Sequence, residues 1–589
     1  MNSLYFLYTR LNQVYTCELN NSAQMKKKKQ IIYLGGFLIL FLSFGFATLK
    51  NKDLELVKNL DIYYTLFREL NMFYVDETDP EDLVTTSIDA MLSSLDPYTT
   101  YIPESDMDDF KFQTTGEYGG IGSLIRRSGD QVMIAEPYDK FPAAKADIRA
   151  GDLILKVNGV STEKMAIESV SDKLKGKPGT ELTLSMKRYG VEDPLEFTLI
   201  REKISIKNVP YYGMIDHGTA YIRISNFTTG ASKEVENALK TLQKEHELHS
   251  LVLDLRSNPG GLLIEAVRIC NLFVDKGEMV VYTRGKMKQW DSDYSTTREA
   301  LDTEIPLVVL VNRGSASASE IVAGALQDLD RAVIIGQRTF GKGLVQTSRP
   351  LKYNAQLKVT TAKYYIPSGR CIQALDYSHR NEDGSVGIVP DSLISEYTTK
   401  NGRLVYDGGG IRPDFEVSPE MLSEISIQLY THSMFFDFAT RYRNTIAEIG
   451  SPETFSISNE EYALFKAFLE EKDFEFKTSS EKAFADLLKS AKREKYYGLA
   501  EKEFSSLEEK LSHNNLKDLE TFEEEIRQIL SEEIVNRYYY QAGRLRAQLR
   551  KDPQLDKARE LLNEPGMLIE VLHGNRGALA KAPKSAASN

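Results

Sequence analysis

The chain has 589 residues, of which 42% are hydrophobic and 27% charged, so it is too long for a single core and too apolar for disorder to dominate. Its net charge of −12 argues against nucleic acid as the main partner, because phosphate binding requires clustered Lys and Arg. Three cysteines without metal-ligand spacing cannot form a disulfide framework, and the histidines form no zinc motif. We therefore expect no metal and no other cofactor.

A basic and then apolar stretch lies near the N-terminus. Four lysines at 26–29 precede an apolar run at 31–49, which is just long enough to span a bilayer as a helix. Lysines on the N-terminal side of the apolar run favour a cytoplasmic N-terminus. The rest of the chain after the run is therefore expected on the extracytoplasmic (periplasmic) side. A small-residue site at 45–47 would also suit a signal peptide. Residues 26–52 are thus predicted to be an anchor or a signal, with the anchor favoured, and residues 1–25 remain unassigned.

Residues 53–112 carry the apolar periodicity of helices. The second helical pattern, DPEDLVTTSIDAMLSSL, opens with Asp79 and Pro80, which suit an N-cap and the first helical turn. Prolines in LDPYTTYIP interrupt the pattern. We predict a helical segment over this range.

Short β-rich runs separated by turns occupy residues 113–203. The Gly-rich stretch GEYGGIGSLI leads into a strand, and AGDLILKVNG reads as a strand and a turn. Together these stretches resemble a PDZ domain, which binds the C-terminus of a peptide as an added strand and holds its carboxylate with amides of the Gly-rich loop. The resemblance places the peptide-binding site at Gly119, Gly120, Ile121 and Gly122.

Residues 204–418 alternate between strand and helix patterns, which is typical of an α/β domain. GTAYIRI, SLVLDLR and PLVVLVN read as strands, whereas SKEVENALKTLQKE and SEIVAGALQDL read as helices. Residues 419–575 are charged, with apolar residues at helical spacing, and predict a packed helical domain. The small, polar end at 576–589 is expected to be disordered.

The stretch GQRTFGKG, at 336–343, nearly matches a phosphate-binding loop. However, Gly343 stands where a Ser or Thr would hold magnesium, and the GLVQTSRPL that follows Lys342 reads as extended chain instead of the required helix. Nucleotide binding is therefore disfavoured, and the lysine is free for another role.

The stretch VNRGSASASEI, at 311–321, places three serines at a strand-to-helix junction. A serine there can act as a nucleophile, because amide N–H groups at a helix N-terminus face the position where an oxyanion would form. It is not a Gly-x-Ser-x-Gly elbow, and no histidine lies nearby as a base. A neutral lysine can serve as the base if burial lowers its pKa from about 10.4 towards neutrality. Lys342, framed by glycines and close to Phe340, is the candidate.

The run VNRGSASASEIVAGALQDLDRAVIIGQRTFGKGLVQ resembles the catalytic core of the carboxyl-terminal processing peptidases, or tail-specific proteases. LDLRSNPGG, KYYIPSGRCIQ and GGGIRPD are also similar to this family. The resemblance covers residues 53–418 and implies a multidomain α+β protein. Its parts would be an N-terminal membrane helix, a helical segment, a PDZ domain and an α/β protease core of the crotonase/ClpP-like type. The C-terminal helical region that follows lies outside the resemblance.

The resemblance also assigns roles to individual residues. It makes Ser317 the nucleophile, Lys342 the general base and Gln346 the residue that orients the lysine. The amides of Gly261 and Ala318 would form the oxyanion hole.

Five further residues have weaker assignments. Asp328 falls at an acidic position of the family and would have a supporting role at most. Ser315 and Ser319 are expected to be turn and cap residues, because they lie on the same helix start. Asp254 and Arg256 suit either a structural ion pair or a catalytic role.

The function expected from these assignments is that of an exported, membrane-anchored serine endopeptidase. It would recognise protein C-termini through its PDZ domain and cleave peptide bonds through an acyl-enzyme. The alternative, a non-catalytic PDZ scaffold, is disfavoured because all three residues of the catalytic set are present. The C-terminal helical region could be an oligomerisation arm, a lid or an adaptor-docking surface.

Overall fold

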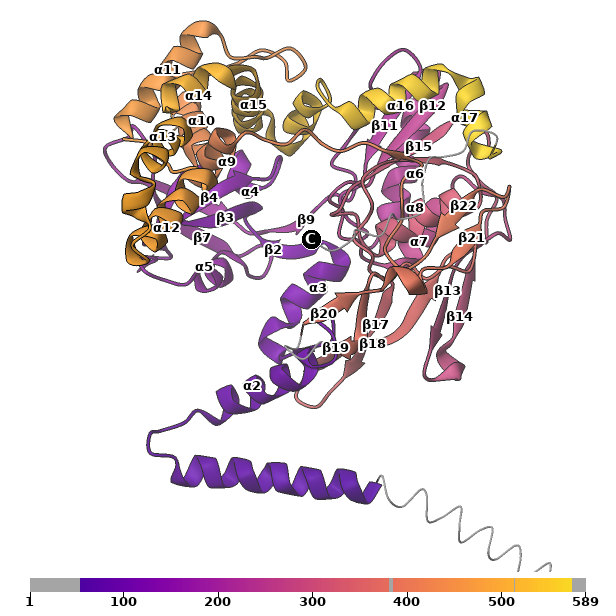
Figure 1. Ribbon diagram of the computed structural model, residues 1–589. Coiled ribbons are helices and arrows are strands. Elements are labelled where there is room, and N and C mark those ends of the chain that lie inside the picture. The colour runs from indigo at the N-terminus through magenta and orange to yellow at the C-terminus, as the bar shows by residue number, and fades with distance from the viewer. Residues whose placement is uncertain (1–52, 381–384, 513, 575–589) are drawn as a thin grey trace, which may run out of the picture. The chain divides into compact units, whose positions relative to one another are not determined.

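The computed structural model describes residues 53–380, 385–512 and 514–574 (Figure 1). The predicted extension at 1–25, the membrane or signal segment at 26–52 and the tail at 576–589 all lie outside the described residues. Within the described part, no helix combines the length and the apolar character needed to cross a bilayer. The chain divides into two compact units, one ending at Met91 and the other beginning at Leu92.

The first unit is helical, as predicted. Residues 53–73 form one helix, and α2 (Pro80–Ser93) follows after a short connection. The Asp79 carboxylate accepts hydrogen bonds from the amides of Glu81 at 2.8 Å and Asp82 at 3.3 Å. These bonds satisfy N–H groups that a helix start leaves unpaired. The predicted N-cap and first-turn proline of α2 are therefore confirmed.

A β-rich domain follows α3 (Met107–Thr115) in the second unit. Its sheet has the order β3-β4-β5-β7-β8, with β6 paired to β5. The strands are β3 (Ser123–Ser128), β4 (Gln131–Pro137), β5 (Leu153–Val157), β6 (Val160–Ser161), β7 (Glu181–Lys187) and β8 (Leu195–Ile200). The helices are α4 (Pro142–Lys145) and α5 (Ile167–Leu174). A separate ribbon of β2 (Glu117–Gly120) and β9 (Glu202–Ser205) joins the two ends of the domain.

The second domain is built on a six-stranded sheet. Its strands, in both chain order and spatial order, are β10 (Tyr211–Met214), β11 (Thr219–Arg223), β12 (Ser250–Asp254), β15 (Leu307–Val311), β16 (Val333–Gly336) and β23 (Phe415–Glu416). All pairs are parallel except β10 with β11. The helices α6 (Ala231–Glu245), α7 (Leu263–Cys270) and α8 (Ala318–Asp328) share a hydrophobic core with one face of this sheet.

The other face of the sheet is covered by the end of the chain. In β15, Leu307 and Val309 face the core with α6, α7 and α8, whereas Val308 and Leu310 face α16 (Pro553–Asn563) and α17 (Pro565–Leu572). Burial on both faces explains the unbroken apolar run of this strand. Figure 1 shows the two yellow helices against β11, β12 and β15. Because each buried leucine contributes about 1.5–3 kcal/mol, these helices are an integral part of the domain built on this sheet.

A second sheet packs against the same core. Its order is β1-β18-β13-β14, and β17 also pairs with β18, in antiparallel orientation. The strands are β1 (Thr100–Ile102), β13 (Met279–Gly285), β14 (Ser292–Ser295), β17 (Leu344–Pro350) and β18 (Gln356–Tyr365). Sequence analysis placed β1 in the helical segment, but in the structure this short strand pairs with β18. Two small hairpins complete the domain: β19 (Leu375–Arg380) with β20 (Val386–Ile388), and β21 (Glu396–Thr398) with β22 (Leu404–Tyr406).

The predicted C-terminal helical domain is present, with a core rich in aromatic side chains. Its helices are α9 (Glu424–Thr431), α10 (Met434–Thr445), α11 (Asn459–Glu471), α12 (Ser479–Arg493), α13 (Glu501–Leu511), α14 (Asn515–Thr521) and α15 (Glu523–Gln548). Tyr540 has φ 55° and ψ −163°, which breaks α15. After α15 the chain continues to α16, which packs on the six-stranded sheet.

Candidate active site

Ser317 lies at the sharp turn between β15 and α8, where it is the N-cap of the helix. Its φ of 55° and ψ of −112° fall outside the regions that a non-glycine residue ordinarily adopts. Strain of this kind persists only where the surrounding structure imposes it, and it is concentrated at active sites. A strained strand-to-helix turn is also how α/β-hydrolases present a nucleophilic hydroxyl.

The other two serines of this turn are committed to the backbone. The Ser315 hydroxyl donates to the carbonyl oxygen of Leu255 at 2.9 Å, and the Ser319 hydroxyl donates to that of Asn258 at 2.9 Å. Both residues are fully buried, whereas Ser317 is partly exposed. Ser315 is thus the expected turn residue, but the expected cap role of Ser319 is wrong, because Ser317 caps α8.

The loop after β12 passes directly over the start of α8. A Cβ added to Gly260 would lie 2.6 Å from the carbonyl oxygen of Ala316 and 2.8 Å from the nitrogen of Ala318, so only glycine fits there. Among the described residues, the amides of Gly261 and Ala318 have no hydrogen-bond acceptor. Unpaired N–H groups of this kind are costly, and two of them beside Ser317 form a site that suits a developing oxyanion.

Lys342 lies in the loop between β16 and β17, and its ammonium rests 4.2 Å from the centre of the Tyr98 ring. Burial, followed by the positive charge of Lys358, lowers the pKa of Lys342 to about 8, although Glu320 and Asp96 act in the opposite direction. A substantial fraction of this lysine is therefore neutral at mildly alkaline pH, as a general base requires. Within the described chain, its ammonium makes no hydrogen bond to Ser317.

A buried carboxylate joins the backbones of Ser317 and Lys342. One oxygen of Glu320 accepts hydrogen bonds from the amides of Ser317 at 2.8 Å and Lys342 at 2.9 Å. The other accepts from the amide of Gly341 at 2.7 Å and the hydroxyl of Thr339 at 2.5 Å. Burial raises the pKa of Glu320 to about 7 in spite of these four donors. Sequence analysis missed this residue, although the Ser-x-x-Glu spacing of a capping box could have indicated it.

A buried phenol joins the same two residues on their other side. The hydroxyl of Tyr364, on β18, is 3.2 Å from the carbonyl oxygen of Ser317 and is also hydrogen-bonded to that of Lys342. Glu320 therefore binds the N–H groups and Tyr364 the carbonyl groups of the same pair. The two backbones are held together through their peptide groups, without use of the Ser317 and Lys342 side chains. Nothing in the local sequence around Tyr364 indicates this role.

Two other predicted site residues lie apart from this pair. The side-chain nitrogen of Gln346 donates to the Thr360 hydroxyl at 3.2 Å and, among the described residues, makes no hydrogen bond to Lys342. Asp328 lies at the far end of α8 from Ser317, where its carboxylate pairs with the buried Arg370 at 2.7 Å. Asp328 thus anchors the turn after β18, and the orienting role of Gln346 stays a prediction.

Asp254, at the end of β12, is the centre of a buried charge cluster. It pairs with Arg223 at 2.7 Å and Arg256 at 2.6 Å, and accepts a hydrogen bond from Tyr221 at 2.6 Å. Burial opposes ionisation, but the two guanidinium groups lower the pKa of Asp254 well below its usual range. Arg256 also pairs with Asp552, at the start of α16. Of the two alternatives, the geometry favours the structural ion pair, which fastens the C-terminal helices to the sheet.

Comparison with known proteins gives three family matches along the chain: peptidase family S41 at 218–392, the PDZ domain at 110–187, and the C-terminal helical domain of probable PDZ-proteases at 425–562. The carboxy-terminal-processing protease of Bartonella bacilliformis is 38% identical over 349 residues, which cover 59% of this chain and 77% of that protein. The chain belongs to the carboxy-terminal-processing protease family.

The chain is also similar to two further proteins. A probable CtpA-like serine protease of Staphylococcus saprophyticus is 35% identical over 391 residues, or 65% of this chain and 75% of that protein. A solved structure of a photosystem II D1 C-terminal processing protease is 28% identical and has a TM-score of 0.33, covering 61% of this chain and 93% of that one. The protein is a PDZ-containing serine protease of the carboxy-terminal-processing family.

In this carboxy-terminal-processing protease, the PDZ domain has a groove of about 430 Å³ between β3 and α5. Ile121, Leu124 and Ile125 line one side, and Ser171 and Leu174 line the other. The lining is mostly apolar, as a groove for an apolar peptide end requires.

The predicted carboxylate loop lies at one end of this groove. Gly119 and Gly120 belong to β2, and Ile121 is buried. Gly122 has φ 73°, and a Cβ there would lie 2.4 Å from that of Phe141. Among the described residues, the amides of Ile121 and Gly122 have no acceptor, which leaves them available to a carboxylate.

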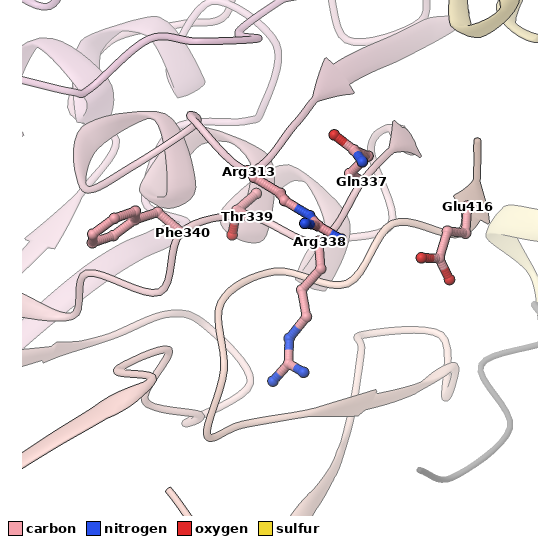
Figure 2. Close-up of a pocket in the computed structure, with 6 residues that line it drawn as sticks. All are labelled: Arg313, Gln337, Arg338, Thr339, Phe340 and Glu416. Carbon is pink, nitrogen blue, oxygen red and sulfur yellow. The ribbon is translucent and has the colours of Figure 1, made fainter. Parts of the chain in front are cut away.

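A second pocket, of about 400 Å³, opens beside the loop that carries Lys342 (Figure 2). The lining residues come from the loops just after β15 and β16 and from β23. They are Arg313, Gln337, Arg338, Thr339, Phe340 and Glu416. In Figure 2, Phe340 and Glu416 lie on opposite sides of the pocket, and the Phe340 ring points away from Glu416. Neither Ser317 nor Lys342 lines this space, so we do not place the scissile bond there.

Proposed function

We propose that this serine protease cleaves peptide bonds with Ser317 as nucleophile and Lys342 as general base. The observation that carries the proposal is the shared clamp on these two residues: the Glu320 carboxylate binds both amides, and the Tyr364 hydroxyl binds both carbonyls. A serine with strained backbone and a lysine of lowered pKa are the groups that such a clamp would bring together.

The reaction follows from the protonation states of these groups. The neutral Lys342 amine accepts the proton of the Ser317 hydroxyl as its oxygen attacks the peptide carbonyl carbon. The resulting oxyanion is stabilised by the amides of Gly261 and Ala318. Lys342 then gives its proton to the leaving amine, and the acyl-enzyme forms. Water, deprotonated by the same lysine, hydrolyses this ester and restores Ser317. Because the ammonium rests on Tyr98, the lysine side chain has to turn towards Ser317 before the first step.

The pH dependence of cleavage tests the role of Lys342. Since only the neutral amine can accept a proton, kcat/KM on an unfolded protein substrate is expected to rise with pH through a midpoint near 8. Lys342→Ala and Lys342→Arg should be inactive between pH 6 and 10, because a guanidinium stays protonated throughout. Activity of either variant within tenfold of wild type would contradict the proposal.

We further propose that the PDZ groove captures the C-terminal tail of the substrate. Ser171→Tyr, which fills the groove, should raise KM for a protein with an apolar C-terminal tail by about tenfold or more, the equivalent of 1.4 kcal/mol or more of lost binding. The kcat for a short internal peptide should be unchanged. Asp172→Tyr, at the next and exposed position of α5, is the matched control. Equal KM values for Ser171→Tyr and wild type would contradict the proposed capture of the tail. If the wild type bound the tail without cleaving the protein, the scaffold alternative would be favoured.

The membrane anchor, export and possible self-association also remain proposals. The anchor is supported by the lysines at 26–29 and the apolar run that follows them. Digestion of intact cells with an added protease would remove the domains from residue 53 onward if they are extracytoplasmic. Full protection of these domains would contradict the proposed orientation.

A further inference from the structure

The segment just before the PDZ domain forms one wall of the lysine's compartment. Tyr98 covers the Lys342 ammonium at 4.2 Å from its ring centre. Asp96 fixes this segment, because its buried carboxylate accepts hydrogen bonds from the amides of Tyr98 and Thr99, each at 2.8 Å. The next residues, in β1, pair with β18. The position of Tyr98 is therefore set by a turn and a strand on either side of it.

The same segment also contacts β18, which pairs with β17, the strand that carries Gln346. The Thr99 hydroxyl donates to Asp96 at 3.0 Å and lies 3.4 Å from the hydroxyl of Thr360. Thr360 in turn accepts the hydrogen bond from Gln346. Beyond Tyr98, the ring of Tyr377 makes an edge contact, with 6.0 Å between ring centres. Tyr98 is thus held on both sides and does not lie loosely over the lysine.

We propose that Tyr98 is a positioning residue for the general base: its ring shields the Lys342 amine from water and holds the ammonium form until a substrate is bound. The proposal rests on the proposed role of Lys342. It places a residue that lies before the PDZ domain in the chain at the active site of the protease core. Tyr98 takes no proton itself, because burial and the hydrogen bond with Tyr377 keep its own pKa above the ordinary value.

Two effects of the ring on the lysine oppose each other. Excluding water disfavours the ammonium form and lowers the pKa of Lys342, whereas the electron-rich ring face attracts the cation and raises it. Burial is the largest cause of the lowered pKa of Lys342, about 8. The other charged groups that act on Lys342 are Asp96, Glu320 and Lys358, and the titratable Tyr364 hydroxyl is bonded to its carbonyl oxygen. Glu320, on α8, and Lys358, on β18, belong to other elements. Asp96 lies in the same turn as Tyr98 but bonds to its backbone amide, which a substitution of the side chain retains.

Three substitutions separate the two effects. Tyr98→Phe keeps the ring, so the pKa of Lys342 and the activity should match those of wild type. Tyr98→Ala admits water, so the pKa should rise towards the ordinary lysine value. Activity at pH 8 should then fall by up to about 100-fold, because the neutral fraction drops from one half to below about 1%. Tyr98→Leu keeps water out but removes the ring face, so the pKa should stay at or below that of wild type.

The full-length protein can be tested with two readouts. The first is the rate at which acetic anhydride acetylates Lys342, followed against pH by peptide mass spectrometry, which gives the pKa without reference to catalysis. The second is the pH profile of kcat/KM. Tyr353→Ala is the control, because this tyrosine is 89% exposed on the loop between β17 and β18. It should leave both readouts unchanged.

Several results would overturn the proposal. They are an unchanged Lys342 pKa in a folded Tyr98→Ala variant, a raised pKa in Tyr98→Leu, or a shift in Tyr98→Phe as large as that in Tyr98→Ala. If the alanine variant does not fold, the Leu and Phe variants still decide the matter. Failure of the proposed catalytic role is a separate result: Lys342→Ala would then retain activity, while the acetylation profile would still report whether Tyr98 controls the lysine.

Discussion

Replacing Ser317 with alanine is expected to abolish proteolysis, with kcat/KM falling by about 10⁴-fold or more, as for other serine nucleophiles. The substitution removes the oxygen proposed to attack but keeps a residue with a Cβ at φ 55°, so the fold should be unaffected. The measurement is the rate of fragment formation from an unfolded protein, followed by mass spectrometry, with the thermal melting temperature as a check on folding.

Ser315→Ala and Ser319→Ala are matched controls within the same turn. Each removes a buried hydroxyl that is hydrogen-bonded to a backbone carbonyl, which should cost about 1–3 kcal/mol of unfolding free energy. Neither removes a reacting atom, so kcat/KM should remain within about tenfold of wild type, a factor worth 1.4 kcal/mol. The assignment of the nucleophile would be wrong if Ser319→Ala were folded and inactive while Ser317→Ala remained active.

Glu320→Gln is expected to have the second largest effect on activity. Its carboxylate accepts four hydrogen bonds, including those from the amides of Ser317 and Lys342. A glutamine would turn an NH₂ group towards two of these donors and leave them unpaired. We expect unfolding free energy to fall by about 3 kcal/mol, and kcat/KM to fall by about 10²-fold because serine and lysine lose their common anchor.

Glu461→Gln provides the matched control for this change. Glu461 occupies the same position of a capping box at the start of α11, where its carboxylate accepts a hydrogen bond from the amide of Ser458 at 2.6 Å. Its loss should lower stability by about 1 kcal/mol without changing kcat/KM. Measuring chemical unfolding and turnover for both variants separates a loss of stability from a loss of activity. Equal turnover for Glu320→Gln and wild type would show that the carboxylate does not align the pair.

Local patterns predicted the elements that carry the chemistry. The apolar run of β15 is buried on both faces, α8 begins immediately after the three serines, and the chain after Lys342 is extended as β17. These features depend on periodicity and on turn chemistry, which lie within a few neighbouring residues. For the same reason, Asp79 could be identified as a helix cap from the residues that follow it.

The contacts that complete the site could not be predicted in this way, because they join residues far apart in the chain. Tyr98 meets Lys342, and the Tyr364 hydroxyl meets the carbonyl of Ser317, across long stretches of sequence. A strand as short as β1 has no periodicity of its own, and its pairing with β18 is a tertiary contact. The packing of α16 on the protease sheet is also invisible in the sequence, since its apolar spacing suits a helical bundle equally well.

The most direct test of the central claim is covalent labelling of the active-site serine. The full-length protein would be treated with a fluorophosphonate between pH 6 and 10, and the adduct located by peptide mass spectrometry. The account requires one adduct, on Ser317, formed at a rate that rises with pH through a midpoint near 8, and no adduct in Lys342→Ala. Labelling at another serine, or undiminished labelling of Ser317 in Lys342→Ala, would contradict it.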